Sequence, residues 1–158
     1  MRKRPPHFSN QATEAKRAME PLCSKFELSL AKSEEDAWGL TLVYQNSTTG
    51  LQLEYSPGEQ DGWRAVIGML VAGSFPKHPI HITENTALKR FDVRDLATER
   101  IQYLPEYQDI TSKASLNIGE ITDIVSRSAA DLFGGDFSVF SALQLRVLAR
   151  LYPANNRV

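Results

Sequence analysis

Two histidines lie three residues apart and form the densest group of potentially catalytic side chains in the sequence. His78 and His81 are separated by a proline and an isoleucine, and the nearest carboxylate is Glu84. On a helix both imidazoles could hold one metal ion. Pro79 favours an extended loop instead, in which positions i and i+3 point to opposite faces. We therefore expect surface histidines with local hydrogen bonds, and a small hydrolase using His78 or His81 with Glu84 stays as an alternative.

Cys23 is the only cysteine, so the chain can form neither an internal disulfide nor a zinc site of several thiolates. A thiol acts as a nucleophile only beside an activating base, and free cysteines are more often small buried residues. The sequence contains no Walker loop, no GxGxxG motif and no HExxH motif. We expect no catalytic residue, no cofactor and no metal.

Acidic residues between positions 34 and 61 carry the strongest indication of binding. They precede one predicted strand and flank two others: Glu34, Glu35, Asp36, Glu54, Glu59 and Asp61. Trp38 and Trp63 each lie at the start of a predicted strand beside these carboxylates. An acidic patch selects basic partners and raises association rates, and tryptophan is common among residues that dominate interface energies. These eight residues form a predicted partner-binding surface, while solvated loops and core tryptophans would give the same pattern.

Composition and charge narrow the class of protein. The chain has 158 residues, of which 42% are apolar and 23% charged, as in a single globular domain. Eighteen Lys and Arg against nineteen Asp and Glu leave a net charge of −1, too small to attract nucleic acid or an anionic membrane. The longest apolar stretch, residues 65–72, is far below the roughly 20 residues that span a bilayer. No apolar segment follows the basic start, so we expect a cytoplasmic protein with no nucleic acid or membrane partner.

Hydrophobic periodicity places a helix first and strands next. The 3.6-residue period predicts a helix over residues 11–24, in which Pro21 is unfavourable. Alternation with period two, or an apolar run for the last, predicts four strands, over residues 26–30, 38–44, 51–55 and 63–70. The short connections at residues 46–50 and 57–62 carry turn residues and favour antiparallel hairpins.

Three helices are predicted after a surface-crossing segment at residues 75–88. Asp92 is a candidate N-cap for the first, which Pro105 ends. Asn117 and Glu120 have the spacing of a capping box at the start of the second, which a glycine pair ends. The third carries an apolar stripe on one side and two arginines on the other.

Segregated strands and helices indicate an α+β fold. We expect a four-stranded antiparallel meander, with the N-terminal helix and three C-terminal helices packed on one face. This domain covers residues 11–152, between a flexible basic arm at residues 1–10 and a tail at residues 153–158.

A strand pair at residues 40–46 and 51–57, and the segment 135–140 that opens the last helix, resemble a group of small bacterial proteins of unassigned function. Several members look like immunity proteins of polymorphic or contact-dependent toxin systems, and the layout is similar over about residues 20–150. The resemblance implies a non-enzymatic protein that neutralises a cognate toxin by covering its active site. It assigns no toxin-contacting residue. A homodimeric secretion chaperone or adaptor is the alternative, and the oligomeric state stays open.

Overall fold

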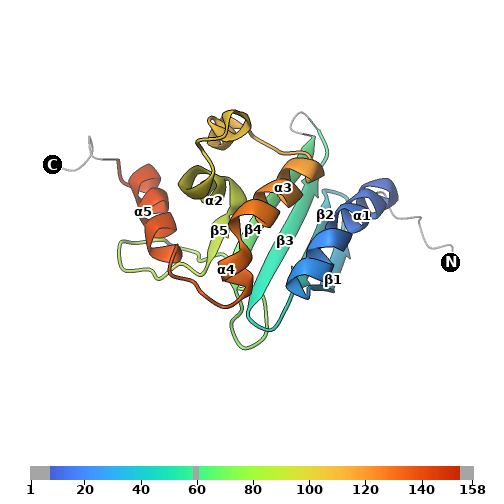
Figure 1. Ribbon diagram of the computed structural model, residues 1–158, viewed down its shortest axis with the longest axis horizontal. Coiled ribbons are helices and arrows are strands. Elements are labelled where there is room, and N and C mark those ends of the chain that lie inside the picture. The colour runs from blue at the N-terminus through green and yellow to red at the C-terminus, as the bar shows by residue number, and fades with distance from the viewer. Residues whose placement is uncertain (1–7, 59–60, 154–158) are drawn as a thin grey trace.

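The centre of the molecule is an antiparallel sheet in which each strand pairs with the next along the chain (Figure 1). Its five strands are β1 (Ser29–Glu35), β2 (Leu40–Gln45), β3 (Thr49–Ser56), β4 (Gly62–Met69) and β5 (Arg90–Asp92). The computed structural model describes residues 8–58 and 61–153. The predicted α+β class and antiparallel meander are confirmed, but the predicted number of four strands is wrong.

Both strands at the edges of the sheet differ from the prediction. β5 has only three residues, too few to show the alternation of a strand in the sequence. It is nevertheless part of the sheet, because Phe91 pairs with Ile67 of β4. β1 begins at Ser29, because the preceding helix continues to Phe26 and ends with Glu27 in the left-handed conformation. All seven residues of β1 are exposed, so its sequence lacks the apolar alternation that a half-buried strand shows.

Within the described residues, five helices accompany the sheet: α1 (Ser9–Phe26), α2 (Val93–Arg100), α3 (Ile118–Ser128), α4 (Ala130–Phe133) and α5 (Phe140–Leu151), with 3-10 turns η1 (Pro105–Tyr107) and η2 (Ile110–Ser112). The predicted caps are present, since Asp92 accepts from the Arg94 N–H at 2.8 Å and Asn117 forms the capping box with Glu120. The predicted second helix is divided at Ala129, whose φ of −116° leaves the helical region. In the part of the chain that the structure describes, four helices therefore follow β5 instead of three.

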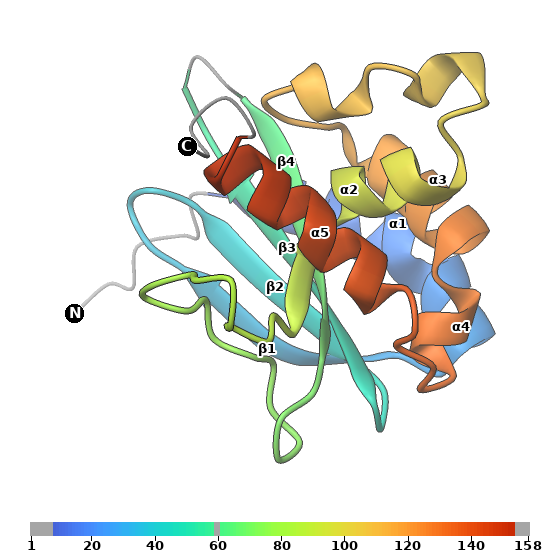
Figure 2. The same ribbon diagram turned by 90° about the vertical axis from the view of Figure 1, so that its left-hand side faces the viewer.

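The helices do not all cover the same surface. Helices α1, α3 and α4 lie over one face of the sheet (Figure 1), whereas α5 lies against α2 beyond the β5 edge (Figure 2). The core between the sheet and the helices includes fully buried side chains from both: Met19, Leu42, Leu51, Leu53, Ile67, Leu96, Ile121 and Ile124. Phe8 also belongs to this core and α1 starts at Ser9, within the predicted arm; residues 1–7 of the arm and 154–158 of the tail lie outside the described residues.

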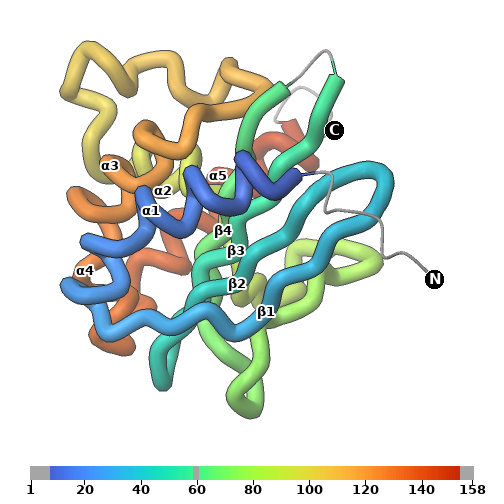
Figure 3. The backbone as a smooth tube through the Cα atoms, turned by 90° about the vertical axis from the view of Figure 1, so that its right-hand side faces the viewer, coloured from blue at the N-terminus to red at the C-terminus, as the bar shows by residue number. Residues whose placement is uncertain are grey.

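On the opposite face of the sheet, two glycines allow a loop to pack closely on the strands. We call the pair Gly50 and Gly68 the glycine seat. The segment between β4 and β5 lies on this side, away from α1 and α3 (Figures 2 and 3). Gly50 and Gly68 are paired across β3 and β4. A Cβ atom on Gly50 would lie 2.6 Å from the Phe75 ring, and one on Gly68 would lie 2.9 Å from Pro76. Only glycines therefore leave room for Phe75 and Pro76 to rest on the strands.

Arg90 of β5 contacts both Phe75 and Pro76 in the segment that packs on the two glycines. It pairs in register with Gly68, and its Nη1 donates to the Pro76 carbonyl oxygen at 3.1 Å. Its guanidinium lies 5.3 Å from the centre of the Phe75 ring, a cation–π contact that contributes about 0.5–2 kcal/mol. We call residues 73–79 the strap, which is thus fixed on the sheet at its centre.

The glycine seat gives the first prediction. Gly50→Ala forces the Phe75 ring to move, so we expect a loss of about 1–3 kcal/mol in the free energy of unfolding, measured by urea denaturation. In a Phe75→Ala background the same substitution meets no ring, and most of its cost should disappear. An equal loss of unfolding free energy in both backgrounds would contradict the packing of Phe75 on Gly50.

Candidate functional site

The face of the sheet opposite α1, α3 and α4 is called the helix-free face below. Three hollows in the described part of the chain lie along it. One is at the turn between β1 and β2, a second is under the strap, and a third is beside α5. Outward positions alternate with core positions along each strand, so the side chains that line these hollows are mainly polar. One outward row runs in register across four strands: Glu34, Thr41, Glu54 and Arg64.

The hollow at the β1–β2 turn has a volume of about 580 Å³ and collects five of the eight predicted binding residues: Glu34, Glu35, Asp36, Trp38 and Glu54. No lysine or arginine is among its lining residues in the described chain. We call it the acidic hollow. Lys32 pairs with Glu34 at 3.2 Å from outside it, but both side chains are more than half exposed, where such a pair contributes little.

The turn places Trp38 in water on a defined backbone. Asp36 Oδ1 accepts hydrogen bonds from the N–H groups of Trp38 at 2.7 Å and Gly39 at 3.0 Å, the arrangement of an Asx turn. A Cβ atom on Gly39 would collide with the carbonyl oxygen of Tyr55, so a glycine lets the turn approach β3. The Trp38 side chain is 83% exposed. A large aromatic residue beside carboxylates and left in water is typical of a binding surface.

The other predicted binding residues lie elsewhere. Trp63 is 3% exposed and packs in the core, with its ring 5.3 Å from that of Tyr55, so it is not available to a partner. Asp61 accepts a hydrogen bond from the Tyr55 hydroxyl, and this bond is the main cause that raises the pKa of Tyr55. Glu59 lies outside the described residues. Within the acidic hollow, Glu35 also has a structural bond, since it accepts from the Phe8 N–H at 2.9 Å.

The candidate catalytic residues are dispersed. His78, His81 and Glu84 are all exposed, and no hydrogen bond or ion pair joins them in the described chain. Of the three, His78 alone lines a hollow of the helix-free face, and its Nδ1 lies 2.8 Å from the Pro79 carbonyl oxygen. Cys23 is half-buried, and burial, with a smaller contribution from Glu20, raises its pKa, which is opposite to the shift of a reactive thiolate.

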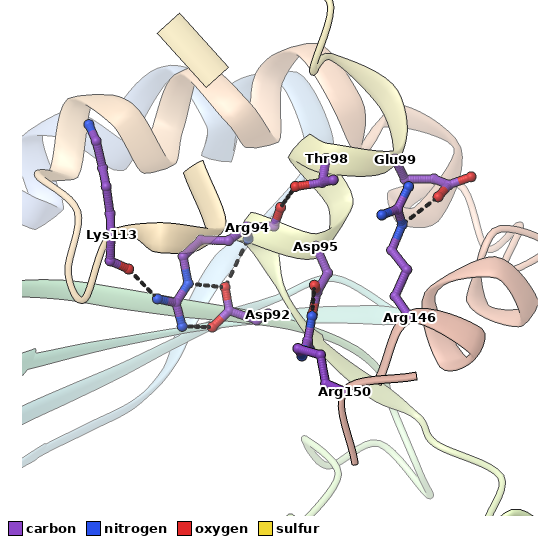
Figure 4. A network of polar contacts seen from close by, with 8 residues as sticks. All are labelled: Asp92, Arg94, Asp95, Thr98, Glu99, Lys113, Arg146 and Arg150. Atoms are coloured by element: carbon purple, nitrogen blue, oxygen red, sulfur yellow. Dashed lines mark hydrogen bonds and ion pairs between the residues drawn. The ribbon is translucent and has the colours of Figure 1, made fainter. Parts of the chain in front are cut away.

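Four of the charged residues that line the third hollow are joined in ion pairs, Asp92 with Arg94 and Asp95 with Arg150 (Figure 4). Arg94 of α2 pairs with Asp92 of β5, and two ion pairs join α5 to α2: Arg150–Asp95 and, outside the lining of the hollow, Arg146–Glu99. Asp95 is 3% exposed, and Arg150 satisfies both of its carboxylate oxygens. The arginines on the polar side of the last helix, visible in the sequence, therefore attach this helix to the fold.

Comparison with known proteins found no matching family model, and no curated protein or solved structure matches the chain either. The described helices include none that is both long enough and apolar enough to cross a membrane. Within the same residues, no group of three or more His, Cys, Asp or Glu side chains could hold a metal ion.

The two tryptophans give the second prediction. Trp38→Ala should change the free energy of unfolding by less than about 0.5 kcal/mol, because the side chain is in water. Trp63→Ala should cost about 3–5 kcal/mol, because it opens a cavity in the core. In single-tryptophan variants made with phenylalanine, acrylamide should quench Trp38 strongly and Trp63 weakly. Comparable quenching of the two would contradict their assignment to opposite environments.

Proposed function

We propose that the acidic hollow and Trp38 form the docking surface for a basic protein, and that the chain is a non-enzymatic immunity protein. In this proposal it neutralises a cognate bacterial toxin by covering the toxin's active site. The observation that carries the proposal is the 83% exposure of Trp38 on a turn fixed by Asp36, beside a hollow lined by carboxylates.

The two parts of this surface would act differently on binding. Burial of the Trp38 ring on a partner removes a large apolar area from water and excludes solvent from the contacts around it. The carboxylates of Glu34 and Glu54 would attract a basic cleft at long range, which raises the association rate more than it lowers the dissociation rate. Toxin domains that act on nucleic acid need such basic clefts, because phosphate contacts dominate their affinity.

The direct test uses the product of the reading frame immediately upstream. We expect it to bind this protein with a nanomolar Kd and to lose toxicity when the two are co-expressed. Trp38→Ala should weaken the affinity by at least about 30-fold, the size of an interface hot spot. Tyr103→Ala removes an aromatic side chain that is 74% exposed but does not line the hollow, and should leave the affinity unchanged.

The outcomes separate the surface from the class of protein. If the upstream product neither harms cells nor binds, the immunity function is wrong. If it binds Trp38→Ala and the original chain equally well, the docking surface is wrong. The combined change Glu34→Gln and Glu54→Gln should slow association and flatten its salt dependence, whereas Glu20→Gln on α1 should not.

One observation favours the alternative of a homodimeric chaperone or adaptor. Among the described strands β1 pairs with β2 alone, and its outer edge could accept a strand from a second copy. However, Lys32, Glu34 and Glu35 place charges along this edge, and its register shifts between Leu30 and Lys32. Both features discourage edge pairing. We expect a monomer in light scattering at micromolar concentration, and a stable dimer would favour the adaptor.

A further inference from the structure

A second hollow of the helix-free face has the opposite charge to the first. Its volume is about 670 Å³, and it lies between the first three strands and the strap. Its charged or titratable lining residues are Lys32 of β1, Lys77 and His78 of the strap, and Arg90 of β5. No carboxylate is among its lining residues in the described chain, and it shares no residue with the acidic hollow. We call it the basic hollow.

The cations of the basic hollow are only partly compensated. Lys32 pairs with the exposed carboxylate of Glu34, whereas Lys77 and Arg90 form no ion pair among the described residues. Arg90 is half-buried, and burial lowers its pKa, with Glu54 opposing this shift more weakly. Removal of a charge from water is unfavourable unless an opposite charge approaches it. An anion in the hollow would supply that charge.

The remaining lining residues are suited to the uncharged part of a ligand. Val43 lies on this face of the sheet but is only 3% exposed, so the half-buried Phe75 ring provides the main apolar wall. The side-chain amides of Gln45 and Gln52 lie beside it, where Gln45 Nε2 donates to the Gly73 carbonyl oxygen at 3.2 Å and Gln52 Nε2 donates to Glu54 Oε1. The volume lies within the range of about 300–1,000 Å³ of sites for small organic molecules, and exceeds what an inorganic ion needs.

We infer that the basic hollow binds an organic phosphate monoester, with the phosphate between Lys32, Lys77 and Arg90 and the organic group on Phe75. A phosphate monoester carries a charge of about −1.5 to −2 and three acceptor oxygens, which matches three cationic donors from three elements better than the single charge of a carboxylate. The inference goes beyond the proposed function and does not depend on it.

The test titrates the full chain with inorganic phosphate, ribose 5-phosphate and adenosine monophosphate by calorimetry, with ribose and adenosine as uncharged controls. We expect saturable submillimolar binding of at least one ester, weaker binding of inorganic phosphate and none of the uncharged controls. Absence of saturable binding by all three phosphates would overturn the inference. Equal affinity for inorganic phosphate and the esters would overturn the role of the apolar walls.

Charge-removing variants locate the site. Lys77→Gln and Lys32→Gln should each weaken ester binding by about fivefold, the size of one exposed charge pair. Both side chains are exposed, so the fold should be retained. Lys16→Gln removes the same charge from α1, on the helix side of the sheet, and should leave binding unchanged. An equal loss with Lys16→Gln would show non-specific attraction and overturn the site.

Discussion

The pairing of Gly50 with Gly68 is the constraint on which the helix-free face of this molecule depends. Side chains at these two positions would keep Phe75 and Pro76 off the sheet, and Arg90 could not reach the Pro76 carbonyl oxygen. One face of the sheet is therefore a core covered by helices, and the other is a polar surface that the strap covers in part. The hollow under the strap thus forms because the strap lies close to the strands at the two glycines, and it needs no gap in the hydrophobic core.

Charge is segregated along the same face. Lys32 and Glu34 are two residues apart on β1 and therefore point to the same side of the sheet, one into the basic hollow and the other into the acidic hollow. The net charge of −1 conceals this separation, because it sums two local surfaces of opposite sign. A basic protein partner and a small anion would therefore approach different parts of one face, which meet at the Lys32–Glu34 ion pair.

Local signals in the sequence predict most of the fold, whereas the site depends on tertiary placement. The capping box of Asn117 and the alternation along the central strands are short-range patterns, so both were predicted correctly. The sequence does not predict β5, which is three residues long, and it places the first strand at residues 26–30 instead of 29–35, because β1 is exposed on both faces. Trp38 and Trp63 have the same kind of sequence neighbourhood but opposite burial, because Trp63 lies in β4 opposite Tyr55 and faces the core, whereas Trp38 lies in the turn before β2. The basic hollow brings together Lys32 and Arg90, which no local pattern connects.

The central claim is that the helix-free face, at its acidic end, is the surface that meets a protein partner. Hydrogen–deuterium exchange of this chain, alone and with the product of the upstream reading frame, tests it most directly. We expect new amide protection confined to residues 33–36, 38–41 and 54–56, which line the acidic hollow, with α1 and α3 unchanged. Protection confined to α1 and α3, with the β1–β2 turn still exchanging freely, would contradict the account.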